Sequence, residues 1–163
     1  MLIRTILCPI DFSEQSEFAC RLACALARDY GARIIVTHVA EPPVPLYGNG
    51  LILPPPQTLK EPLLAKLHEF LPPDSKIQIE HCVVEGDAAT EILRVAGETK
   101  CDLIVIGTHG RTGVRRLLLG SVAEQVVRKA PCPVLTTTVP TRRASSSDES
   151  GAAAAGERTK AMT

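Results

Sequence analysis

Three glycines and a serine in the second half of the chain carry the clearest chemical signal: Gly107, Gly110, Gly120 and Ser121. Glycine lets backbone N–H groups come close to an oxyanion, because it has no side chain to stand between them. Gly120 and Ser121 also open an expected helix, whose first N–H groups and dipole favour a phosphate. The segment predicts a phosphate-binding loop, in which the Ser121 hydroxyl either binds the ligand or caps the helix. The alternative is an ordinary turn that ends in a serine cap.

Two other segments should meet this loop at one edge of a sheet. Residues 9–13 and 38–40 each follow or end an apolar run that is expected to form a strand. In an open parallel sheet, ligands bind outside the carboxyl ends of the strands, where the strand order reverses. Asp11 is the carboxylate in the first of these segments. It either binds the ligand or caps the first helix together with Ser13.

Several catalytic motifs are absent from these positions. The chain contains no G-x-x-x-x-G-K-[ST] phosphate loop, and no G-x-G-x-x-G follows the first expected strand. It also lacks the His-x-Gly-His of nucleotidyl transferases and the Ser-Gly-Gly-x-Asp-Ser loop of ATP pyrophosphatases near that strand. No nucleophile–base pair can be located. The sequence therefore favours binding over catalysis, with slow hydrolysis left open because a metal and an oriented water can support some turnover.

Apolar runs and helical patterns alternate along the chain. This alternation predicts the strands and helices that would bring the glycine loop and residues 9–13 and 38–40 together. The order βαβαβαβαβ predicts an α/β fold, an open five-stranded parallel sheet with helices on both faces, of the flavodoxin or Rossmann type. Strands are expected over residues 2–10, 33–39, 76–85, 101–107 and 134–139, and helices over 13–30, 58–71, 87–99 and 121–130.

Local signals define the helix ends. Gly31 should close the first helix and Asp87 should cap the third. Ser121 with Glu124 fits a capping box for the fourth helix. Thr58 with Glu61 fits another for the second, but Pro62 lies where a backbone N–H is wanted. The regular part of the second helix is therefore expected to begin nearer Pro62.

Composition excludes several classes of function. The 163 residues include 18 basic and 18 acidic side chains, so the chain lacks the basic excess of a nucleic-acid-binding domain. No apolar stretch is long enough to span a bilayer, and the N-terminus does not resemble a signal peptide because Pro9 and Asp11 interrupt it early. A cytoplasmic protein is expected. Six cysteines in mostly apolar segments are interpreted as reduced structural thiols.

Two segments depart from the alternation. Residues 40–57 contain six prolines around Gly48-Asn49-Gly50, which predicts a long loop of open role. From about residue 141 large apolar residues nearly vanish. We expect one domain over residues 1–140 and a disordered tail over 141–163.

His38 and His81, on the second and third strands, are interpreted as hydrogen-bonded strand residues rather than metal ligands.

Three motifs together resemble the universal stress protein family over residues 2–139. They are the spacing G-x₂-G-x₉-G-[ST] from Gly107 to Ser121, the segment Ile6 to Ser13, and the ending Pro131-Cys132-Pro133-Val134-Leu135. The resemblance implies a flavodoxin-like sheet, a homodimer paired through the last strand, and binding of ATP, often with Mg²⁺ or Mn²⁺. It implies a nucleotide-dependent regulatory protein of the stress response, with a slow ATPase or another nucleotide-processing enzyme as the alternative.

The resemblance also implies roles for individual residues. Asp11 would hold the ribose hydroxyls or lie near the metal, and the Val39 backbone would meet the adenine edge. His109 would contact ribose or phosphate, or serve only through its backbone. The full set of expected nucleotide-binding residues is Pro9, Ile10, Asp11, Val39, Gly107, His109, Gly110, Arg111, Gly120, Ser121 and Val122.

Overall fold

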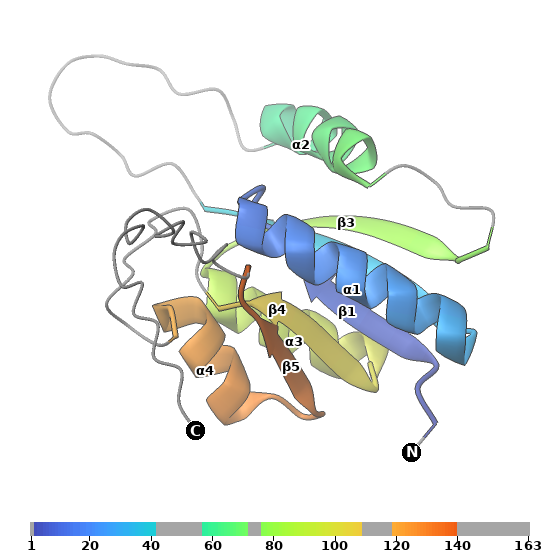
Figure 1. Cartoon of the computed structure of the whole chain (residues 1–163). Coiled ribbons are helices and arrows are strands. Elements are labelled where there is room, and N and C mark those ends of the chain that lie inside the picture. Colours follow the sequence, from blue (N-terminus) through green and yellow to red (C-terminus); the bar gives the residue numbers. More distant parts are fainter. Residues whose placement is uncertain (1, 42–56, 72–75, 109–118, 140–163) are drawn as a thin grey trace, which may run out of the picture.

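Strands and helices alternate through the whole described part of the chain, as the sequence predicts (Figure 1). The computed structural model describes residues 2–41, 57–71, 76–108 and 119–139, with residues 57–59 described by their backbone alone. The elements are β1 (Thr5–Pro9), α1 (Glu14–Tyr30), β2 (Arg33–Ala40), α2 (Gln57–Phe70), β3 (Ile79–Glu85), α3 (Ala88–Thr99), β4 (Leu103–Gly107), α4 (Ser121–Lys129) and β5 (Val134–Thr137). The expected tail and most of the Pro-rich segment lie outside the described residues.

The five strands form one parallel sheet in the order β3-β2-β1-β4-β5. The chain first winds outward from β1 through β2 to β3, then crosses to the other side of β1 to form β4 and β5. The order therefore reverses between β1 and β4, as in doubly wound nucleotide-binding folds. This confirms the predicted α/β architecture.

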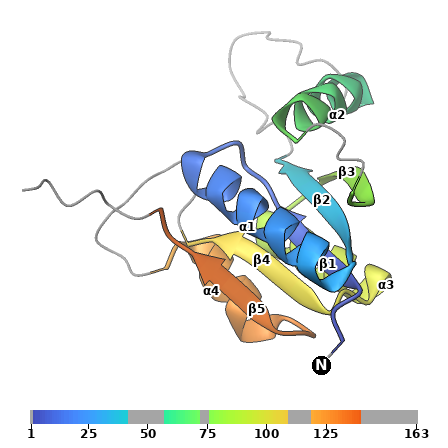
Figure 2. The same cartoon turned by 45° about the vertical axis from the view of Figure 1, so that its right-hand side comes forward.

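Helices cover both faces of the sheet, and each face has its own core. Helices α1 and α2 lie on one side, and α3 and α4 lie on the other (Figures 1 and 2). Alternate residues of β1 point to opposite sides: Ile6 and Cys8 pack under α1, whereas Leu7 packs under α3 and α4. Burial on both faces explains why the inner strands are continuous apolar runs.

The predicted ends of α1 and α3 are confirmed. The Ser13 hydroxyl accepts a hydrogen bond from the Ser16 N–H, and Gly31 closes α1 at φ 65°, the left-handed conformation that glycine adopts without strain. The Asp87 carboxylate accepts a hydrogen bond from the Thr90 N–H at the start of α3. Local sequence decides these ends because each cap uses groups within four residues of itself.

Several expected boundaries are wrong. Strand β1 starts at Thr5 rather than at residue 2, β3 starts at Ile79 rather than at residue 76, and β5 ends at Thr137 rather than at residue 139. Helix α2 begins at Gln57, with Thr58 and Pro62 inside it. Pro62 is exposed and has no backbone N–H, so the helix continues through it with one backbone hydrogen bond fewer. The strand β4 starts at Leu103 rather than at residue 101, because the Cys101 N–H donates to the Ala96 carbonyl at the end of α3.

The predicted cap of α4 is also wrong. Gly120 is the N-cap residue and makes no side-chain cap hydrogen bond, and Ser121 is the first helical residue. The Gly120 N–H donates to the Thr108 carbonyl at 2.6 Å, which holds Gly120 at the turn into the helix. The Ser121 hydroxyl is therefore not used as the helix cap.

Candidate functional site

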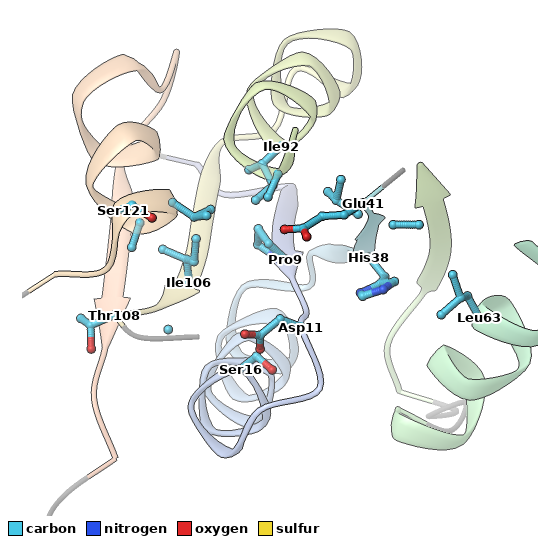
Figure 3. Close-up of a pocket in the computed structure, with 16 residues that line it drawn as sticks. Pro9, Asp11, Ser16, His38, Glu41, Leu63, Ile92, Ile106, Thr108 and Ser121 are labelled. Carbon is cyan, nitrogen blue, oxygen red and sulfur yellow. The ribbon is translucent and has the colours of Figure 1, made fainter. Parts of the chain in front are cut away.

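A cavity of about 710 Å³ opens at the carboxyl ends of the strands, where the order reverses between β1 and β4. Its size is typical of small-molecule sites, and its place in the sheet is where doubly wound folds bind ligands. Figure 3 shows the lining side chains. The described residues that line it are Pro9, Asp11, Ser16, His38, Val39, Ala40, Glu41, Leu63, Ala88, Ile92, Ile106, Gly107, Thr108, Ser121, Val122 and Ala123.

Asp11 is held in place at the end of β1. One carboxylate oxygen, Oδ1, accepts hydrogen bonds from the Ser13 N–H at 3.0 Å and from the Ser13 hydroxyl at 2.5 Å. These contacts span the tight turn between β1 and α1. Because Ser13 itself caps the helix, Asp11 does not act as the α1 cap. Its carboxylate instead lines the cavity.

The turn that carries Asp11 is built around Phe12. This residue has φ 63°, a left-handed conformation that is uncommon for a bulky side chain. Its ring lies against the His38 ring (centroids 4.5 Å apart) and edge-on to the Phe70 ring (5.6 Å), and the Lys66 ammonium lies 4.1 Å from its centroid. Packing against β2 and α2 therefore holds the turn in its strained shape.

His38 is buried beside this turn, and its Nδ1–H donates to the Ile10 carbonyl at 2.7 Å. His81 in β3 makes a similar bond, from Nε2–H to the Leu71 carbonyl at 3.1 Å. Burial lowers the pKa of His81, and the nearby His68 lowers it further. Both histidines are hydrogen-bonded strand residues, as expected from the sequence.

The opposite wall of the cavity is formed by the end of β4 and the start of α4. A side chain at Gly107 would place its Cβ 3.1 Å from the Gln15 backbone, so this close approach of β4 to α1 requires glycine. The Thr108 N–H donates to the Thr137 carbonyl at 2.8 Å, which ties this end of β4 to β5. Ser121 follows, with its side chain exposed at the cavity.

Electrostatically, the cavity combines three helix N-termini with two carboxylates. Ser16 in α1, Ala88 in α3 and Ser121 in α4 all lie in the first turn of their helices and all line the cavity. Their helix dipoles and N–H groups favour an anion. Asp11 and Glu41 are the acidic side chains (Figure 3), and no described lining residue is Lys or Arg. The site suits a ligand that offers both an anion and hydroxyl or cationic groups.

Apolar side chains form the remaining walls. Ile92 of α3 and Ile106 of β4 lie on one side of Pro9, and Leu63 of α2 lies on the far side of His38 (Figure 3). Such walls accommodate a flat apolar group such as a heterocyclic base. The arrangement therefore offers an apolar pocket next to an anion-binding edge.

The family model of the universal stress protein family matches residues 2–138, which span every strand and helix of the structure. The chain belongs to the universal stress protein family. Universal stress protein MJ0531 of Methanocaldococcus jannaschii is 36% identical over 138 residues, covering 82% of this chain and 81% of the relative.

Solved structures agree with this assignment. The structure of MJ0577 from the same organism has a TM-score of 0.73 at 28% identity and covers 86% of this chain and 99% of its own. A universal stress protein solved in complex with cAMP has a TM-score of 0.63 at 24% identity, with 84% and 98% covered, and shares the fold. Both solved structures therefore share the fold of this chain.

Several of the nucleotide-binding residues that the family resemblance implies meet in the cavity. Ile10 does not line it: its side chain is buried in the core, its N–H donates to the Thr37 carbonyl and its own carbonyl accepts from His38. Gly120 supports the site through its backbone. His109, Gly110 and Arg111 lie outside the described residues. The implied residues that line the cavity are Pro9, Asp11, Val39, Gly107, Ser121 and Val122.

Sequence reasoning missed other members of the site. Glu41 and Thr108 directly follow β2 and β4, so the rule that ligands bind at strand ends could have found them. Leu63 and Ile92 reach the cavity from α2 and α3, and no local signal marks them.

Within the described residues, no helix is long and apolar enough to cross a membrane, and no three His, Cys, Asp or Glu side chains are grouped to hold a metal ion.

Proposed function

We propose that this chain is an ATP-binding universal stress protein, in which nucleotide occupancy regulates a homodimer. The observation that carries the proposal is the cavity at the switch point, where three helix N-termini and the Ser121 hydroxyl meet the fixed Asp11 carboxylate. The phosphates would lie against the first N–H groups of α4. The ribose hydroxyls would donate to Asp11, and the base would lie between the apolar walls near Val39. The neighbour in complex with cAMP holds an adenine nucleotide on the same fold.

A divalent cation fits the site only when a bound nucleotide supplies phosphate oxygens as further ligands. Mg²⁺ is commonly held by one or two carboxylates together with phosphate oxygens. Asp11 and Glu41 are the carboxylates that line the cavity, and the described residues offer no cluster of three protein ligands. We therefore expect Mg²⁺ or Mn²⁺ to enter with ATP, where it would neutralise phosphate charge next to these two carboxylates.

Calorimetric titration of nucleotide-free protein with ATP and Mg²⁺ tests the binding. We expect saturation near one ATP per chain, and weaker binding when a chelator replaces the metal. Asp11→Asn keeps the Ser13 contacts but removes the charge, and it should weaken binding at least tenfold, about 1.4 kcal/mol. Asp29→Asn, at an exposed position of α1, is the matched control and should bind like the parent. Absence of saturable binding to folded, nucleotide-free protein would refute the proposal.

The proposed homodimer would pair through β5. This strand is the last in the sheet order, so one of its edges has no partner strand in the described chain. It is four residues long, and Leu135 is 36% exposed. An exposed strand edge with apolar side chains is a natural pairing surface. We also place the protein in the cytoplasm, since all six cysteines are free thiols.

A further inference from the structure

Two thiols from distant parts of the chain meet at the end of the sheet opposite the cavity. Cys101 lies between α3 and β4, and Cys132 lies in the turn between α4 and β5. Their Sγ atoms are 3.5 Å apart although the residues are separated by 31 positions. This juxtaposition is set by the pairing of β4 with β5, in which Ile104 is opposite Val134.

A disulfide needs an S–S distance of about 2.05 Å, so the sulfurs must approach by about 1.5 Å. The Cys101 side is anchored: the next residue, Asp102, donates its N–H to the Thr5 carbonyl and accepts hydrogen bonds from the Arg4 and Thr5 N–H groups. The Cys132 side is a surface turn, in which Pro131 and Pro133 are exposed. The Pro133 carbonyl accepts a hydrogen bond from the Ile104 N–H of β4, so the approach falls to the Cys132 side chain and the Pro131 side of the turn.

The two sulfurs differ in access and in hydrogen bonding. Cys101 is 5% exposed, whereas Cys132 is only partly buried and is open to a small oxidant. Burial raises the pKa of both thiols. The contact with the Cys101 sulfur lowers the pKa of Cys132, which offsets part of that rise. Cys132 is therefore the sulfur that an oxidant meets first, and Cys101 is the neighbour placed to react next.

We propose that Cys101 and Cys132 are a modification site, at which a hydroperoxide converts the two thiols into a reversible intramolecular disulfide. The Cys132 thiolate attacks one peroxide oxygen and breaks the O–O bond, giving a sulfenic acid and, after protonation, one water from hydrogen peroxide. The Cys101 sulfur then attacks the Cys132 sulfur and displaces a second water. Two thiols and one hydrogen peroxide thus yield one disulfide and two waters. A dithiol restores the two thiols by thiol–disulfide exchange and becomes a disulfide itself.

The disulfide would restrict the movement of the turn that precedes β5. The turn that carries Cys132 leads directly into this four-residue edge strand, and the bond would join it to the anchored start of β4. The raised thiol pKa values imply slow oxidation at neutral pH. Because the thiolate is the reactive form, the rate should rise as the pH increases from 7 to 9.

Peptide mapping of the full chain after treatment with hydrogen peroxide tests the site. We expect a single cross-linked peptide pair that contains Cys101 and Cys132, formed within one chain and removed by dithiothreitol. Cross-links within the set Cys8, Cys20 and Cys24, links between chains, or oxidation of Cys132 to a sulfinic acid without a cross-link would each overturn the proposal.

Cysteine variants test whether Cys101 and Cys132 are the two residues that form the cross-link. Cys132→Ser and, independently, Cys101→Ala should abolish the cross-link. Cys82→Ser removes a partly buried thiol outside the pair and is the matched control, which should cross-link like the parent. If Cys82→Ser abolished the link, or if Cys132→Ser retained it, the assignment would be wrong. Mapping of the unaltered chain decides the question even if a variant fails to fold.

Discussion

At the scale of single residues, the turn after β1 shows how packing holds a strained backbone for a binding role. Phe12 has φ 63°, where a side chain costs about 1–2 kcal/mol relative to glycine. The contacts of its ring with His38, Phe70 and Lys66 offset this cost. The same turn directs the Asp11 carboxylate to the cavity and the Ser13 hydroxyl to the helix. One aromatic side chain thus links α2 to the proposed ribose site.

Two substitutions at Phe12 separate strain from packing. Phe12→Ala loses the ring contacts but keeps the strain, whereas Phe12→Gly loses both. We therefore expect the glycine variant to be more stable than the alanine variant by about 1 kcal/mol, measured by urea unfolding. At Phe18, in the regular part of α1, the order should be reversed by about 1 kcal/mol, because glycine is the poorer helix former. If the alanine variant were the more stable one at Phe12 as well as at Phe18, Phe12 would not be strained.

At the scale of elements, the sequence predicts most reliably what depends on neighbours along the chain. The caps of α1 and α3 follow from residues within one helical turn. The cap of α4 does not, because the hydrogen bond from Gly120 to Thr108 decides where that helix begins. The left-handed conformation of Phe12 and the cavity wall at Leu63 could not be predicted from the sequence, because both depend on how α2 packs against the turn after β1 and against the sheet.

The two N-terminal serines give a matched pair for testing the helix ends. Ser13→Ala removes a true cap and should lower the free energy of unfolding by about 1 kcal/mol. Ser121→Ala should change it by less than about 0.5 kcal/mol, because Ser121 is the first helical residue and makes no cap. The same Ser121→Ala protein should bind ATP several-fold more weakly in calorimetry. Equal destabilisation by the two substitutions would mean that Ser121 caps α4 after all.

At the scale of the whole molecule, the two proposed sites lie at opposite ends of one sheet. The cavity lies where the strands end, and the thiol pair lies where β4 and β5 begin. The edge strand β5 connects them: its Thr137 carbonyl accepts from Thr108 at the cavity, and its first residue follows the Cys132 turn. A change at either end would therefore reach the exposed edge through which we propose that two copies pair.

Sedimentation equilibrium tests this pairing directly. The parent should behave as a dimer of the 17.5 kDa chain and dissociate only on dilution. Leu135→Arg places a charge on the exposed edge strand and should shift the equilibrium toward monomer by at least tenfold, since the charge would have to be buried without a partner. Tyr30→Arg is the control: Tyr30 is 51% exposed in the last turn of α1, whereas it is Gln15, in the first turn, that bonds the Val139 N–H after β5, and the substitution should leave the dimer intact. A single 17.5 kDa species at every concentration would exclude the dimer, whereas a dimer unaffected by Leu135→Arg would place the interface on another surface.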